Sequence, residues 1–241
     1  DAVFAGEKDA EDGRWNYKRP LPETWPTQYR GTKFLGRFTA FRHVGYFPEQ
    51  TPHWDWMIDR IKGKSDVKIL NLFAYTGVAS LLAAKEGARE VTCIDRSATA
   101  LDAARQAAEL NGVAKIVSFQ KAEAFEALEK LRGTAARKFD VVICDPPAFV
   151  KSRKDLKTGT QGYRKLVRLA APLVAPGGFF FVASCSHLVD PSLFGEQVRR
   201  GLRDGERTGR ILRASGAALD HPVHPGLPET AYLKALTLQL D

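Results

Sequence analysis

The sequence predicts an α/β fold, an open and mostly parallel sheet with helices on both faces. From Val67 onward, short apolar runs typical of buried strands alternate with longer segments of helical periodicity. Turns that contain glycine or proline separate these segments. Hydrophobic residues make up 44% of the 241 residues, enough for a large core and too many for a disordered chain. Ligands of such folds bind at the carboxyl ends of the strands.

The individual elements follow from local signals. Ser97 is a suitable N-cap for the helix expected after it, and Asn111-Gly112 is a suitable end for that helix. Asp190-Pro191 is a typical start for a later helix. Pro176-Gly177-Gly178 should break another helix. Seven strands are expected at 67–73, 90–95, 115–119, 139–144, 179–184, 209–214 and 232–240. Helices are expected at 78–88, 98–111, 123–133, 163–174 and 191–202.

The first 60 residues differ from the rest and are interpreted as a small N-terminal extension, with the main domain at 61–241. The extension holds all four tryptophans and many prolines. Short strands are expected at 33–41 and around 45–50. Trp54, Ile58 and Ile61 then recur at helical spacing.

Composition limits the possible functions. The net charge of +8 suits a polyanionic partner without establishing one. The three cysteines form neither a disulfide framework nor a zinc pattern, so no metal is predicted and a reducing, cytoplasmic location is expected. No apolar stretch reaches the roughly 18 residues of a membrane span.

The loop after the first strand of the main domain, "NLFAYTGVAS" at 71–80, suggests a nucleoside site. A dinucleotide-binding loop needs the G-x-G-x-x-G pattern, whereas Gly77 is the single glycine here. The loop therefore suits a ligand without phosphate, such as S-adenosylmethionine. The alternative is a plain strand-to-helix turn.

Two acids follow the next strands. Asp95, about 20 residues after the first loop, can accept hydrogen bonds from both ribose hydroxyls of a nucleoside. Glu123 could accept a bond from an adenine amino group. Either residue could instead be an acid placed favourably at a helix N-terminus.

The fourth strand ends in Asp145-Pro146-Pro147, with Phe149 close behind. The prolines lack backbone donors and stiffen the loop, which can hold its carbonyls and Asp145 toward a bound base. Phe149 offers a stacking face or packs internally. This pattern indicates a planar, amino-bearing substrate beside a methyl donor, and the alternative is a rigid loop start.

Cys185 follows the fifth strand and lies at the ligand edge of the predicted sheet, so its thiolate could be a nucleophile. Cys93 and Cys144 lie inside strands and are interpreted as inert core residues.

Together these motifs resemble a known family. The stretches "NLFAYTGVASLLAAKEGA", "DRSATALDAARQAAELNG", "CDPPAFVKSRKDL", "SCSHL" and "LPETAYLKAL" are similar to those of the bacterial large-subunit ribosomal RNA cytosine-C5 methyltransferases. These are class I S-adenosylmethionine-dependent enzymes with a Rossmann-like fold. The resemblance covers about residues 45–241.

The resemblance implies a role for each matching position. Asp145 would contact the pyrimidine ring near N3, and Cys185 would be the nucleophile that attacks carbon 6. Relatives usually carry Asp at position 123, which weakens the expected adenine contact of Glu123. The residues expected to bind S-adenosylmethionine are Gln50, Asn71, Ala74, Tyr75, Gly77, Asp95, Arg96, Ser97, Glu123 and Ala124.

The resemblance also implies an RNA partner, which basic residues after the Asp-Pro-Pro loop would contact. Relatives usually carry an N-terminal RNA-binding domain of the PUA type, for which this chain has too few residues before Val67. Arginines near 199–210 are interpreted chiefly as a solvated face. The residues expected to contact the substrate are Pro146, Pro147, Phe149, Lys151 and Arg153.

Other functions remain open from the sequence. A guanine-N methyltransferase of ribosomal RNA has a similar loop but needs no cysteine. An adenine-N6 methylase is disfavoured because Ala148 separates the prolines from Phe149. A nicotinamide oxidoreductase is disfavoured by the single glycine of the first loop, and a non-catalytic RNA-binding module could keep the same fold.

Overall fold

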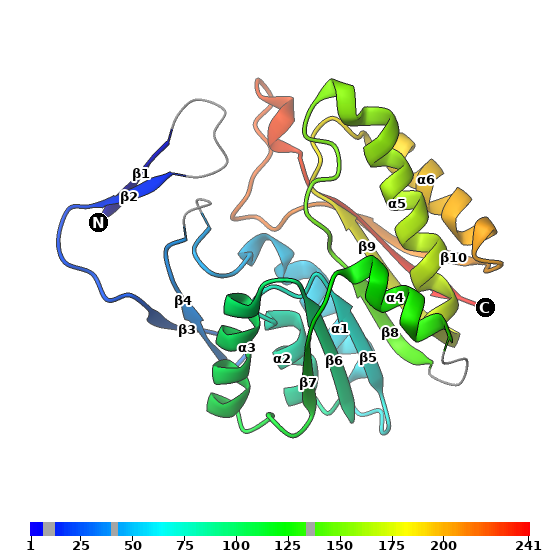
Figure 1. Ribbon diagram of the computed structural model, residues 1–241, viewed down its shortest axis with the longest axis horizontal. Coiled ribbons are helices and arrows are strands. Elements are labelled where there is room, and N and C mark those ends of the chain that lie inside the picture. Colours follow the sequence, from blue (N-terminus) through cyan, green and yellow to red (C-terminus); the bar gives the residue numbers. More distant parts are fainter. Residues whose placement is uncertain (7–12, 40–42, 134–137) are drawn as a thin grey trace.

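The computed structural model describes residues 1–6, 13–39, 43–133 and 138–241, and its centre is a seven-stranded sheet (Figure 1). Five neighbouring strands are parallel, and the strand next to them runs antiparallel to both of its neighbours. The predicted α/β fold with a mostly parallel sheet is confirmed. The spatial order is β10 (Gly209–Ser215), β11 (Lys234–Leu240), β9 (Val174–Ser184), β8 (Phe139–Cys144), β5 (Lys68–Leu72), β6 (Glu90–Asp95) and β7 (Val117–Lys121).

Helices cover both faces of the sheet. On one face lie α1 (Thr51–Ile61), α2 (Val78–Lys85) and α3 (Ala98–Leu110). On the other lie α4 (Ala124–Gly133), α5 (Leu156–Ala170) and α6 (Pro191–Asp204). Alternate residues of β5 serve the two faces, since Ile69 packs with the first group and Leu70 and Leu72 with the second. The parallel strands are thus buried on both faces, as their continuous apolar runs predict.

Two elements of the main domain begin earlier than the sequence predicts. Helix α5 begins at Leu156 rather than Tyr163, directly after a 3-10 turn, η2 (Arg153–Asp155), which starts with a capping box of Ser152 and Asp155. Strand β9 begins at Val174 rather than Phe179 and includes the predicted Pro-Gly-Gly break. The helix before it ends at Ala170, where a 3-10 turn, η3 (Ala171–Leu173), follows.

The N-terminal region contains two hairpins, which lie to one side of the sheet in Figure 1. The predicted strand at 33–41 overlaps β4 (Thr32–Gly36), and its residues 40 and 41 lie outside the described residues. The predicted strand around 45–50 is wrong: Pro48 opens a 3-10 turn, η1 (Pro48–Gln50), that runs into α1. The hairpins pair β1 (Ala2–Ala5) with β2 (Arg14–Tyr17) and β3 (Trp25–Tyr29) with β4 (Thr32–Gly36).

The extension is tied to the sheet domain by specific contacts. Thr76 donates a hydrogen bond to the carbonyl of Gly45 over 2.8 Å, and Lys33 exchanges hydrogen bonds with the Asn111 side chain. Helix α1 packs into the same core cluster as α2. The domain division at residue 60 stays a prediction. Within the described part of the chain, none of the helices has the length and apolar character needed to span a membrane.

Candidate active site

The loop between β5 and α2 has an unusual backbone. Gly77 caps α2 in the left-handed conformation with a φ of +73°, and a Cβ there would lie 3.0 Å from the Cβ of Ala104. Phe73 and Tyr75 also have positive φ, at 57° and 52°. Non-glycine residues in this conformation cost free energy and cluster at functional sites. The glycine is therefore required by both backbone and packing, and the loop carries strain where a ligand is expected.

Asp95, at the end of β6, ties this loop to the next helix. Its two carboxylate oxygens accept hydrogen bonds from the backbone amides of Tyr75 and Ser97, each over 2.8 Å. Ser97 in turn caps α3 by accepting a bond from Ala100, as the sequence predicts. Arg96 between them is exposed. A carboxylate has about four lone-pair positions, so Asp95 keeps acceptor capacity for a ligand beside its structural bonds.

Glu123 and Ala124 lie next to Asp95. The backbone amide of Ala122 donates to the carbonyl of Asp95 over 3.0 Å, which places the start of α4 beside the end of β6. Glu123 is exposed at the helix start, and Ala124 is buried against the core. The structure thus brings the predicted nucleoside contacts to one edge of the sheet.

A pocket opens at this edge beside the first loop. Its volume, counted together with the open solvent at its mouth, is about 820 Å³. The pocket does not reach Gly77, Asp95 or Glu123. It extends instead along α1 between that helix and the sheet, where His53, Trp54 and further aromatic side chains line it. The predicted residues that line it are Gln50, Asn71, Ala74, Tyr75 and Asp145.

Asn71 and Gln50 are held differently within this pocket. The Asn71 amide donates to the Ser80 hydroxyl over 2.9 Å, so its orientation is fixed by α2. Gln50 is buried and donates to the Asp145 carboxylate over 2.9 Å. Its own carbonyl oxygen is buried without a hydrogen-bond partner in the described part of the chain. A buried acceptor without a partner is costly, which favours a ligand donor beside it.

Asp145 has a perturbed acidity. Burial raises its pKa to about 7, and the negative charge of Glu49 adds to the shift. Glu49 is itself buried, and its carboxylate accepts a hydrogen bond from the Tyr232 hydroxyl over 3.0 Å. Glu49 and Tyr232 are not among the site residues predicted from the sequence. The one sequence feature that could have indicated them is their position: Glu49 directly precedes Gln50, and Tyr232 lies in the stretch "LPETAYLKAL" that resembles the family.

Cys185 lies next to the loop that begins at Asp145. Its thiol lies 3.8 Å from the carbonyl oxygen of Pro146, the residue after Asp145. Burial and, to a smaller extent, the charge on Asp145 raise the pKa of Cys185 to about 11, while a backbone hydrogen bond of Cys185 and the charge of Lys234 act in the opposite direction. Burial also raises the pKa of Cys93, to about 12, and that of Cys144. Cys93 and Cys144 are fully enclosed in strands, in keeping with their interpretation as inert core residues.

Buried hydroxyls support the turn that carries Cys185. The Tyr163 hydroxyl accepts a hydrogen bond from Ser184 over 2.8 Å and lies 2.9 Å from the hydroxyl of Ser186. Ser186 also accepts from the amide of Val150 over 3.2 Å. The residues on both sides of Cys185 are thereby fixed to α5 and to the loop after β8.

The loop after Asp145 is packed rather than open. Phe149 packs against Tyr163, with ring centroids 4.8 Å apart. A Cβ at Gly159 would lie 2.3 Å from the carbonyl oxygen of Phe149. Packing is thus the contact that the structure gives Phe149, and its stacking on a substrate stays a prediction. Pro146 is buried, whereas Pro147, Lys151 and Arg153 are exposed beside the site.

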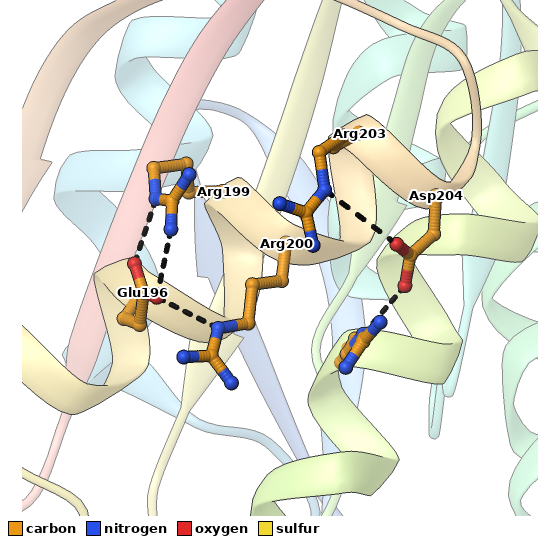
Figure 2. Close-up of polar contacts among 6 residues, drawn as sticks. Glu196, Arg199, Arg200, Arg203 and Asp204 are labelled. Atoms are coloured by element: carbon orange, nitrogen blue, oxygen red, sulfur yellow. Dashed lines mark hydrogen bonds and ion pairs between the residues drawn. The ribbon is translucent and has the colours of Figure 1, made fainter.

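The arginines of α6 are paired with acids (Figure 2). Arg199 and Arg200 both bond to Glu196, and Arg203 lies near Asp204. The two arginines lower the pKa of Glu196 to about 2. This arrangement fits a solvated helix face, which is the interpretation favoured from the sequence.

Comparison with known proteins identifies the family. A family model for S-adenosylmethionine-dependent methyltransferases matches residues 7–237. Ribosomal RNA large subunit methyltransferase I of Aeromonas salmonicida is 41% identical over 210 residues, covering 87% of this chain and 52% of that protein. The enzyme of the same name from Klebsiella pneumoniae is 34% identical over 220 residues, covering 91% and 54%. The chain therefore spans about half the length of the curated relatives it matches.

Solved structures show the same fold. An S-adenosylmethionine-dependent methyltransferase from Agrobacterium tumefaciens superposes with a TM-score of 0.72 at 29% identity, covering all of this chain and 76% of that one. A methyltransferase crystallised with S-adenosylhomocysteine gives a TM-score of 0.81 at 21% identity, covering 94% of this chain and 58% of that one. This likeness confirms the class I methyltransferase fold. With a family model matching nearly its whole length, the chain belongs to the S-adenosylmethionine-dependent methyltransferases.

Proposed function

We propose that this chain methylates carbon 5 of a cytosine in ribosomal RNA through a covalent adduct with Cys185. The observation that carries the proposal is the contact between the Cys185 thiol and the carbonyl of Pro146, which puts the thiol beside Asp145. The thiol that would act as nucleophile then lies close to a carboxyl group that has a pKa near neutrality and lines the pocket. The names of the curated relatives support ribosomal RNA as the substrate.

The residues present fit S-adenosylmethionine, which supplies an electrophilic methyl group when bound. The strained loop offers Ala74, Tyr75 and Gly77 for its methionine part, together with Asn71. The spare acceptor capacity of Asp95 suits ribose hydroxyls. Further contacts proposed from the sequence are Arg96, Ser97, Glu123 and Ala124, with Gln50 closing the site.

The chemistry needs a nucleophile because carbon 5 of cytosine reacts poorly with a methyl group. The Cys185 thiolate forms a bond to carbon 6 while N3 accepts a proton from Asp145, and carbon 5 becomes electron-rich. After carbon 5 has gained the methyl group, a base removes its proton, the sulfur–carbon bond breaks, and the thiolate leaves. Because the pKa of Asp145 lies near 7, its carboxyl can hold and release that proton at neutral pH.

RNA would approach over the exposed end of the Asp-Pro-Pro loop. Lys151 and Arg153 lie there and can contact phosphates, in keeping with the net charge of +8. A base in structured RNA must turn out of its helix to reach Cys185. A cytoplasmic location belongs to the same proposal.

Nucleoside mass spectrometry of ribosomal RNA from cells with and without this protein tests the proposal. Loss of 5-methylcytidine supports it, and loss of a methylguanosine instead would overturn it in favour of a guanine-N methyltransferase. Unchanged ribosomal RNA would overturn it in favour of another substrate or a non-catalytic module. RNA with 5-fluorocytosine at the target adds a test of Cys185, since fluorine cannot leave as a proton does. A covalent complex should accumulate with the native protein and be absent with Cys185→Ala.

A further inference from the structure

Lys234 is a buried cation beside the proposed nucleophile. It begins β11, pairs in register with Ser184 of β9, and has only 8% of its surface exposed. Its ammonium donates hydrogen bonds to the carbonyl oxygens of Ser186 over 2.6 Å and Tyr232 over 2.7 Å. Ser186 directly follows Cys185, so the lysine holds the turn on which the thiol sits.

The charge of this lysine is not neutralised by an acid within the described part of the chain. Its two hydrogen-bond partners are neutral carbonyl groups, and no carboxylate of the described residues forms an ion pair with it. A buried charge without a counterion is unfavourable, because it has lost its hydration without gaining an opposite charge. Burial accordingly lowers the pKa of Lys234, and negative charge on Cys185 or Asp190 opposes that shift.

We propose that Lys234 is a positioning residue that stabilises the thiolate of Cys185 as its buried counterion and fixes the turn that carries it. Only the use of that thiolate on RNA rests on the proposed function. When the S–H bond breaks, the proton passes to solvent and the ammonium keeps its own protons. The result is a thiolate and an ammonium that neutralise each other in a buried setting.

The other charged side chains around the thiol do not provide this stabilisation. Burial and the charges on Asp145 and Glu49 all raise the pKa of Cys185, while a hydrogen bond from its own backbone and the charge of Lys234 lower it. Tyr163 and Tyr232 also face the thiol, and a charged Cys185 raises the pKa of each. Among the described groups that act on Cys185, Lys234 is therefore the cation that favours its ionised form.

The test follows the alkylation of Cys185 by iodoacetamide from pH 6 to 10, with the Cys185 peptide quantified by mass spectrometry. Lys234→Gln can still donate to the two carbonyls but carries no charge. It should slow alkylation at pH 8 by about tenfold and move the profile up by about one pH unit. Lys234→Arg should restore most of the rate. Lys115→Met, at an exposed lysine, is the control and should leave the profile unchanged.

The outcomes separate this inference from the proposed function. If Lys234→Gln keeps the native profile, or if Lys234→Arg slows alkylation as much as Lys234→Gln, the inference is overturned. Thermal melting of each variant shows whether it is folded. If Lys234→Gln unfolds, a second measurement uses the native protein. Raising the salt concentration should leave the pH profile of Cys185 alkylation nearly unchanged, because a buried ion pair is weakly screened. A strongly salt-dependent profile would contradict the inference. Activity of Cys185→Ala on ribosomal RNA would defeat the proposed function alone.

Discussion

The side-chain amide of Gln50 donates a hydrogen bond to the carboxylate of Asp145 over 2.9 Å, although 95 residues separate them in sequence. The bond joins the turn before α1 to the end of β8. Because Glu49 lies next to Gln50 and raises the pKa of Asp145, one short turn both binds this carboxyl group and adjusts its acidity.

Replacing Glu49 should change the pH dependence of methylation. Its negative charge raises the pKa of Asp145, so Glu49→Gln should lower that pKa. If the protonated carboxyl is the active form, the alkaline loss of activity should move to lower pH, by about 0.5–1 unit. The measurement is kcat against pH on the RNA substrate. Glu229→Gln, at an exposed glutamate, should not move the profile, and an unmoved profile in Glu49→Gln would contradict the role of Glu49.

Asp145 should make the protein less stable at alkaline pH. Its pKa is raised from 3.8 to about 7 in the folded protein, so folding favours the protonated form. This contribution to stability is complete below pH 4 and is lost as the pH rises through 7. Asp145→Asn should therefore increase the free energy of unfolding at pH 8 by roughly 1–3 kcal/mol and much less at pH 5. Urea denaturation at both pH values measures the difference. Asp102→Asn on the exposed face of α3 is the control, and an equal gain at both pH values would argue against the raised pKa.

Gly77→Ala should weaken both the fold and donor binding. The new Cβ would lie 3.0 Å from Ala104 in a backbone with a φ of +73°. The expected cost is about 1–2 kcal/mol in stability, with weaker binding of S-adenosylmethionine in calorimetry. Gly112→Ala is a matched control, because Gly112 has a φ of +70° but no atom within 4 Å of the new Cβ. Equal effects of the two variants on binding would show that the close approach at Gly77 is unimportant.

Removing the Tyr163 hydroxyl should loosen the turn around Cys185. Tyr163→Phe leaves the hydroxyls of Ser184 and Ser186 without this partner in a buried site. A loss of about 1–3 kcal/mol in unfolding free energy is expected, together with a lower kcat. Chemical denaturation measures the first effect, and Tyr17→Phe at an exposed tyrosine controls for loss of a hydroxyl. A variant as stable as the native protein would show that the hydroxyl network does not hold the turn.

The parts of the site that the sequence reveals all lie at strand ends. Asp95, Asp145 and Cys185 each follow an apolar run, and parallel strands bring such ends to one edge. Glu49, Tyr232 and Lys234 could not be found in this way. They join the site because Gln50 of η1 bonds to Asp145 at the sheet edge and β11 inserts beside β9, and local periodicity encodes neither arrangement.

The start of α5 shows a different limit. Gly159 and Gly162 have low helix propensity, so the helical pattern becomes visible only at Tyr163. In the structure, side chains at these positions would collide with Phe149. Tertiary packing therefore requires residues that obscure the helix in the sequence.

The hydrogen bond from Thr76 to the carbonyl of Gly45 limits how far the chain can be truncated from its N-terminus and where another domain can be fused to it. A shortened version that starts after Gly45 would leave the Thr76 hydroxyl without its acceptor and release one anchor of the strained loop between β5 and α2. Fusing a foreign leader to this chain should succeed only where the join lies upstream of that glycine.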